Sequence, residues 1–63
     1  MFKIGERVKV VGSLNPEYNS VIGIIDYDYS GLYKIKTENF HQEHVTFEGF
    51  KLELCPVKEE NEI

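Results

Sequence analysis

His41 and His44 are the two histidines of the chain and stand three residues apart, a spacing that invites a test for metal binding. A zinc site needs two further nitrogen, sulfur or carboxylate ligands that converge on the ion. Glu43 and Cys55 are the only arguable additions, and this set is too weak a pattern to predict a metal. No Ser/His/Asp order, phosphate-cradling glycine loop or paired-carboxylate signature stands above chance. The sequence therefore predicts no catalytic residue, no metal and no cofactor, and we expect that the chain is not an enzyme.

The length and the cysteine content favour one small domain without covalent cross-links. A chain of 63 residues buries only about 60% of the surface that its unfolded form exposes, so oligomerisation is one way to add stability. Cys55 is the single cysteine, which excludes an internal disulfide and favours a reducing compartment. The start of the chain reaches Glu6 and Arg7 too early for a signal peptide. No apolar run approaches the roughly 20 residues that cross a membrane, so we expect a soluble cytoplasmic protein.

The charge balance argues against tight binding to a phosphate backbone. The net charge is −4, from seven Lys and Arg against eleven Asp and Glu, whereas nucleic-acid binding normally rests on clustered Lys and Arg. Glu59, Glu60 and Glu62 lie in the last five residues. We expect residues 57–63 to form a short, flexible acidic tail behind a folded domain of residues 1–56.

The hydrophobic pattern is strand-like almost everywhere. Alternation and β-branched runs predict five short strands, near residues 7–10, 21–25, 32–37, 45–48 and 52–55. A long polar loop over 12–20, a hairpin turn from Asp26 to Gly31, a polar connection over 38–43 and a tight turn over 48–51 join them. Pro56 ends the last strand because proline cannot donate to the ladder. Five such strands close on themselves or leave long open edges, so a small all-β barrel is expected.

Two segments carry a resemblance to a known superfamily. Residues 4–11, Ile-Gly-Glu-Arg-Val-Lys-Val-Val, followed by residues 21–25, Val-Ile-Gly-Ile-Ile, look like the opening of KOW-type and related SH3-like barrels. The tight turn and final strand from Glu48 to Leu54 are similar to the end of the same barrels. The resemblance covers residues 4–56 and implies a five-stranded SH3-like barrel. It also implies that Gly5 lies in the turn before the first strand and that Gly23 lies where a strand bends sharply.

The same resemblance suggests an aromatic binding site. Tyr18, Tyr27, Tyr29 and Phe40 lie in predicted loops, and loops of SH3-like barrels lie near one another, which implies that these rings gather into one groove. Such clusters bind proline-rich segments, modified lysines or bases. Alternatively, each ring caps the open end of a thin core. The chain has no Trp to form the floor of a proline-peptide groove, so proline-rich peptides are not expected.

Two strand faces are further candidate surfaces. The basic residues Arg7, Lys9, Lys34 and Lys36 alternate with core positions, and KOW-like domains contact RNA through such faces; a solvated face is the alternative. Val21, Gly23 and Ile25 are alternate residues of one strand and are expected to face the interior of the barrel. Ile22 and Ile24 then face outward, where beside Leu14 or Leu32 they would form an apolar interface, unless a loop covers them.

One enzyme family has a similar opening. The plasmid-borne type of dihydrofolate reductase is an SH3-like barrel that begins Gly-Asp-Arg-Val-Arg, similar to Gly-Glu-Arg-Val-Lys at residues 5–9. Its active strand, Val-Gln-Ile-Tyr, corresponds to Val-Thr-Phe-Glu at residues 45–48, where three of the four residues differ. Without the Gln and Tyr, the folate-binding pore is not expected here.

Together these patterns predict a small interaction module, bacterial or phage-encoded, that binds a protein partner or a second copy of itself through the aromatic loop end or the apolar strand face. A KOW-like nucleic-acid, ribosome or transcription accessory domain is the first alternative. An acidic phage protein that blocks a host DNA-binding enzyme is the second. The sequence favours a protein partner over nucleic acid and gives no reason to expect a membrane.

Overall fold

The computed structural model describes residues 2–56, and the acidic tail expected over 57–63 lies outside them. The described chain is all-β and contains five strands and two single turns of 3₁₀ helix. The elements are β1 (Arg7–Val10), η1 (Pro16–Tyr18), β2 (Ile22–Asp28), β3 (Leu32–Thr37), β4 (His44–Glu48), η2 (Gly49–Lys51) and β5 (Leu52–Leu54). In this described part, no helix is long and apolar enough to span a membrane.

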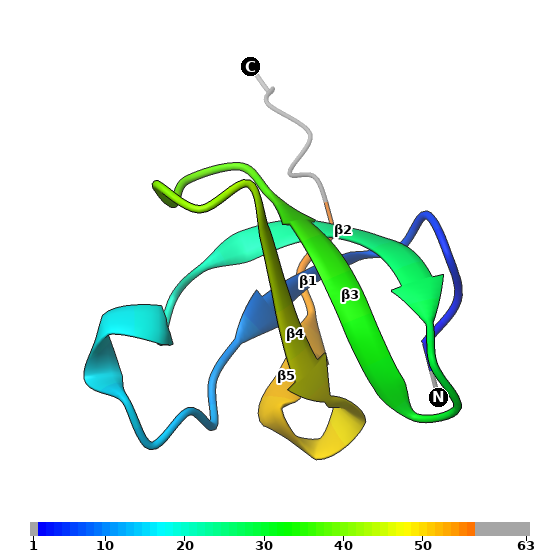
Figure 1. Cartoon of the computed structure of the whole chain (residues 1–63), viewed down its shortest axis with the longest axis horizontal. Helices are drawn as coiled ribbons and strands as arrows, with labels where there is room; N and C mark the ends of the chain where they lie inside the picture. Colours follow the sequence, from blue (N-terminus) through cyan, green and yellow to red (C-terminus); the bar gives the residue numbers. More distant parts are fainter. Residues whose placement is uncertain (1, 57–63) are drawn as a thin grey trace.

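The five strands form one antiparallel sheet in the order β4-β3-β2-β1-β5. The sheet curls strongly, so that β4 passes in front of β5 in the view of Figure 1. No hydrogen-bonded ladder joins these two strands within residues 2–56, so the sheet is not closed and both strands are edges. All five expected strands are present, and the all-β prediction is confirmed.

The turn between β2 and β3 is shorter than the sequence suggested. The sequence predicts Asp26, Tyr27 and Asp28 in the hairpin turn, but all three continue β2. Asp26 is the unpaired extra residue at a register shift, and Tyr27 and Asp28 pair with Lys34 and Tyr33 of β3. Aspartate is rare in strands because its side chain competes for backbone groups, and here the pairing with β3 overrides that preference. The Asp28 carboxylate accepts a hydrogen bond from Gly31 N–H (2.9 Å). Asp28 therefore stabilises the turn at the point where β2 ends.

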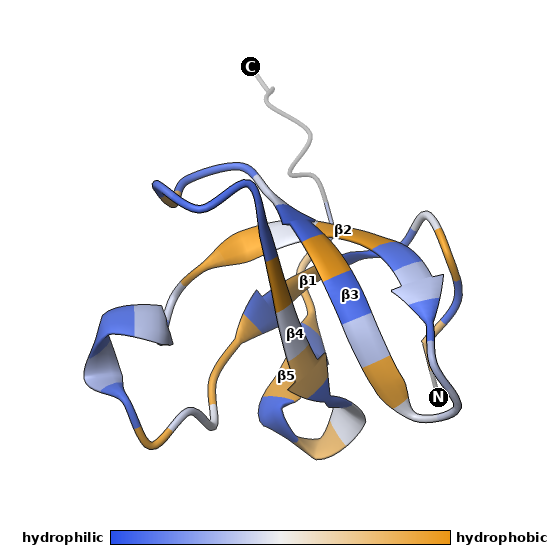
Figure 2. Ribbon diagram, viewed as in Figure 1, coloured by the Kyte–Doolittle hydropathy of each residue, from blue (hydrophilic) through white to orange (hydrophobic). Residues whose placement is uncertain are grey.

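The core lies on the concave side of the sheet and is built by alternate residues. It consists of Val8, Val10, Val21, Ile25, Tyr33, Ile35, Val45 and Leu52, each at most 7% exposed. Burial alternates along β3, where Tyr33 and Ile35 are buried between more exposed neighbours, as a half-buried strand requires. Figure 2 shows Ile35 as a hydrophobic position between hydrophilic ones on this strand. The expected parities are confirmed, since Val21 and Ile25 point inward while Ile22 and Ile24 point outward.

Candidate functional site

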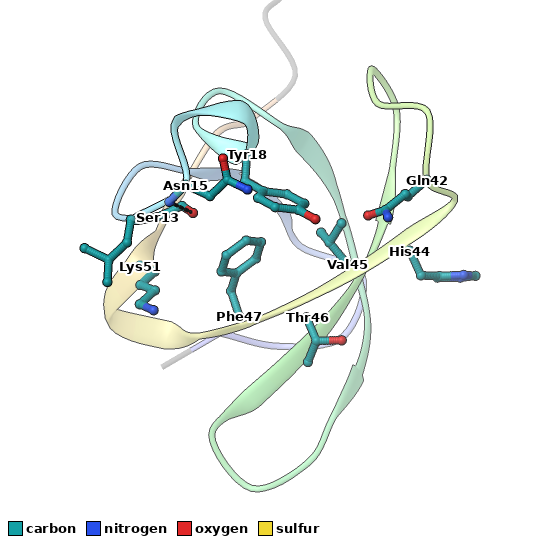
Figure 3. Close-up of a pocket in the computed structure, with 10 residues that line it drawn as sticks. Ser13, Asn15, Tyr18, Gln42, His44, Val45, Thr46, Phe47 and Lys51 are labelled. Carbon is teal, nitrogen blue, oxygen red and sulfur yellow. Dashed lines mark hydrogen bonds between the residues drawn. The ribbon is translucent and has the colours of Figure 1, made fainter.

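A groove of about 490 Å³ runs between the loop that precedes β2 and the outer strand β4 (Figure 3). We call it the loop–β4 groove. One wall comes from the β1–β2 loop and the other from β4 and its neighbours. Its lining residues are Ser13, Leu14, Asn15, Tyr18, Gln42, His44, Val45, Thr46, Phe47 and Lys51. A concave, partly apolar site with a few polar groups is the usual form of a binding site.

Aromatic rings form the floor of the groove. The Tyr18 ring lies edge-on against Phe47, with 5.7 Å between centroids, and tilted against Phe40 at 5.2 Å. All three rings are half-buried and pack against the core. Two rings of the predicted aromatic site, Tyr18 and Phe40, are therefore brought together. Tyr18 and Phe47 line the groove, and Phe40 packs behind Tyr18. From the sequence, Phe47 is expected only as part of a strand.

The loop wall is held in place by its own polar residues. The Asn15 side chain accepts a hydrogen bond from Glu17 N–H (3.1 Å) and caps η1, while Ser13 Oγ accepts one from Asn15 N–H (3.1 Å). The Asn19 side-chain amide accepts a hydrogen bond from the backbone N–H of Ser13 and donates one to the Ser13 carbonyl. Side-chain bonds of this kind fix turns locally. The wall therefore exists before anything binds, which lowers the entropy cost of binding.

Leu14 is the unusual member of this wall. It lines the groove, yet its side chain is 95% exposed. A single exposed aliphatic side chain is ordinary on a protein surface, but this one stands on a hydrogen-bonded loop at the groove, where a bound ligand can contact it. From the sequence, Leu14 is expected only as a neighbour of Ile22 and Ile24.

The expectation of a single aromatic groove is wrong. Tyr27 and Tyr29 stack on each other, with 4.6 Å between ring centroids, and both are exposed. In the antiparallel register, Gly23 pairs with Thr37 at one end of β2 and Asp28 with Tyr33 at the other. Tyr18 and Phe40 belong to the first end, whereas Tyr27 and Tyr29 belong to the second, roughly 20 Å away along seven residues of strand.

The apolar strand face is also smaller than expected. Ile22 and Ile24 point away from the core but are half-buried, and Ile24 lies between Arg7 and Lys36 in the sheet. Long basic side chains cover apolar neighbours with their methylene stems. Leu14 lines the groove and Leu32 stands at the far end of β3, so neither extends an apolar patch around the isoleucines.

The four basic residues do lie on the outer face, but one of them is committed to an ion pair. Arg7 forms a bidentate ion pair with the Glu38 carboxylate, in which Nε donates to Oε2 (2.8 Å) and Nη2 donates to Oε1 (2.9 Å). Its Nη1 donates a further hydrogen bond to the Cys55 backbone carbonyl (2.9 Å). Lys9 sits opposite Glu53 on β5, and Lys34 and Lys36 alternate on β3. The Arg7 contacts tie β1 to the β3–β4 loop and to the end of β5.

The Arg7–Glu38 pair makes stability depend on pH. The hydrogen bond from Arg7 holds the pKa of Glu38 below its usual range, although partial burial opposes the shift. Because folding lowers this pKa, the pair contributes fully above the ordinary carboxyl pKa of about 4.3, and the contribution is lost as the pH falls through the lower folded-state value. We expect the urea midpoint of the native protein to fall more between pH 7 and pH 3 than that of Glu38→Gln. Equal losses in the two proteins would contradict this role.

The histidine pair is not assembled into a metal site. His41 Nε2 lies 4.0 Å from Glu17, and His44 Nε2 lies 3.3 Å from Asp26, so the two rings face different carboxylates. Within residues 2–56, no group of three His, Cys, Asp or Glu side chains is arranged to hold a metal ion. Cys55 is a free, half-buried thiol beside Arg7.

Comparison of the chain with protein-family models, curated proteins and solved structures finds no match.

Proposed function

We propose that this chain is a small SH3-like β-barrel that acts as a non-catalytic interaction module and binds a protein partner in the loop–β4 groove. The strand order, the 3₁₀ turn before the last strand and the positive φ of Gly5 (97°) in the turn before β1 support this kind of barrel. The lone thiol favours a cytoplasmic setting.

The observation that carries the proposal is the position of Leu14, an exposed aliphatic side chain on a loop held by hydrogen bonds. Leu14 lies beside a groove with an aromatic floor. Binding sites for protein segments combine such an apolar anchor with a preformed wall. Nucleic acid has weaker support, because Arg7 is engaged by Glu38 and the acidic residues outnumber the basic ones. Binding alone, without chemistry, is what the groove offers.

Leu14→Ser tests the proposal. Leu14 makes little contact with its own domain, so we expect the variant to melt like the native protein but to bind its partner about tenfold or more weakly, as the loss of a buried leucine predicts. The measurement is affinity capture from nuclease-treated lysate, followed by calorimetric titration of the captured protein. Ile4→Ser is the matched control, since Ile4 is 64% exposed and does not line the groove.

Capture that is equal for Leu14→Ser and the native domain would place the interaction elsewhere. Material that is recovered only without nuclease would point to nucleic acid instead of a protein.

A further inference from the structure

β4 is an edge strand, and its free backbone groups can be assigned from the register. Each residue of β4 lies opposite a β3 residue, from Leu32 with Glu48 to Lys36 with His44. One pair further on, Thr37 N–H donates to the Glu43 carbonyl (2.9 Å), so this pair exchanges hydrogen bonds. Because bonded and non-bonded pairs alternate along an antiparallel ladder, Val45 and Phe47 direct their backbone groups to β3. His44, Thr46 and Glu48 direct theirs away from the sheet.

The loop–β4 groove follows this open edge. It is lined by four consecutive residues of β4, His44 to Phe47, although successive side chains of a strand point to opposite faces. A groove that is lined by residues from both faces of β4 must run along the edge of the strand instead of across one face. The free N–H and C=O groups of His44 and Thr46 therefore face the groove, with the Val45 and Phe47 side chains on its inner side.

This edge lacks the usual protection against pairing. Sheet edges are commonly blocked by a proline, a lysine, a bulge or a very short strand. β4 reads His-Val-Thr-Phe-Glu over five residues and pairs with β3 without a register shift. The other edge strand, β5, has three residues and is followed closely by Pro56. The two edges therefore differ in the way expected if only β4 is kept open for a ligand.

We propose that the loop–β4 groove binds its protein partner by strand addition: an extended segment pairs with the free edge of β4. This inference rests on the proposed function and names its ligand. Alternate residues of the segment face Val45, Phe47 and Tyr18 and are apolar, while the others face solvent. Main-chain bonds supply affinity in such complexes, and the pockets for alternate side chains supply specificity.

The acidic residues that flank the groove favour a basic segment. Glu17 is exposed in the loop wall, and Glu43 is exposed just before β4. Lys51 is the single lysine or arginine among the described lining residues, and it pairs with Glu48 at 3.5 Å, so these two charges offset each other. Opposite charges on neighbouring strands are favourable, so the segment carries Lys or Arg beside its apolar positions.

The shape of the groove favours one added strand over a second copy of the domain. A second copy would bring β3 along on the far side of its own β4. The loop wall, from Ser13 to Tyr18, faces β4 across the groove and restricts the space for a second strand there. A single extended segment has no such neighbour and fits between β4 and the loop.

The test uses the full chain and a blocked peptide of sequence Lys-Val-Thr-Val-Thr-Val-Lys, titrated by NMR. Thr46→Pro removes an N–H that faces the groove and keeps the ladder to β3, since proline is tolerated on an edge strand whose N–H faces outward. Thr46→Val is the matched control because it keeps the N–H and the β-branched shape. We expect Thr46→Val to bind like the native chain and Thr46→Pro to bind about tenfold or more weakly. Shifts of the amides of His44 and Thr46 should accompany binding.

Equal affinity of the two variants, or no binding by any of them, would overturn strand addition. Strand addition can fail while the proposed function holds: if Leu14→Ser weakens binding of the natural partner while Thr46→Pro does not, the groove binds its partner through side chains alone. The proposed function itself fails if Leu14→Ser binds the partner as the native domain does. A change in sedimentation that is lost in Thr46→Pro without any peptide would show a second copy on this edge and would also overturn the inference.

Discussion

Gly23→Ala is expected to leave the domain largely unfolded at 25 °C. A Cβ at this position would collide with the backbone carbonyl of Lys36 and lie 2.6 Å from Cγ2 of Ile35. Neither neighbour can move easily, because the next pair, Ile24 with Lys36, holds β2 against β3 and Ile35 is fully buried. Overpacking of this kind costs on the order of 3 kcal/mol, and a domain of this size rarely has more than about 3–5 kcal/mol in total.

The measurement is urea unfolding followed by circular dichroism, with Gly31→Ala as the comparison. Gly31 has a positive φ of 99° and no atom within 4 Å of the added Cβ, so that variant pays only for its backbone conformation, roughly 1–2 kcal/mol. We expect Gly31→Ala to remain folded with a lower midpoint. A Gly23→Ala protein as stable as Gly31→Ala would show that β2 and β3 do not approach as closely as described.

Val45→Pro is expected to unfold the protein, whereas Thr46→Pro is expected to leave it folded. The register directs the Val45 N–H into the ladder with Ile35, and Val45 is also buried in the core at 7% exposure. Proline at this position removes the ladder bond and the packed side chain, a loss of about 3 kcal/mol or more. One residue further on, the same substitution removes only an N–H that faces the groove.

Thermal melts of the two proline variants check this contrast, and two-dimensional NMR spectra show whether each is folded. Thr46→Val again controls for loss of the threonine hydroxyl. If Thr46→Pro unfolds as Val45→Pro does, the backbone groups of β4 are assigned in the wrong direction, and the open edge proposed for ligand binding is not there. If both variants stay folded, β4 contributes less to the sheet than its pairing indicates.

The sequence alone was sufficient to locate five strands and to predict the buried face of most of them, although not the full length of β2. The alternation in residues 7–10 and 32–37 indicated which side chains are buried, and Val8, Val10, Tyr33 and Ile35 are indeed in the core. The parity of residues 21–25 was also correct, with Ile22 and Ile24 outward. These predictions succeed because a strand turns successive side chains to opposite faces, so a few neighbouring residues contain the whole signal.

The site depended on which loops share an end of the sheet. The aromatic residues Tyr18 and Phe40 meet because β2 begins where β3 ends, and the same register places Tyr27 and Tyr29 at the opposite end. No local pattern contains that information, since it depends on the length of β2, which pairing extended by three residues beyond Ile25.

The sequence by itself determined an all-β chain, its five strands and the inward face of most of them. The tertiary structure alone decided that β4 is an edge, that Leu14 and Tyr18 stand across from it, and that Thr46 turns its backbone outward. The physical reason is that alternation is a property of adjacent residues, whereas a groove is made by segments about thirty residues apart that only strand order and register bring together.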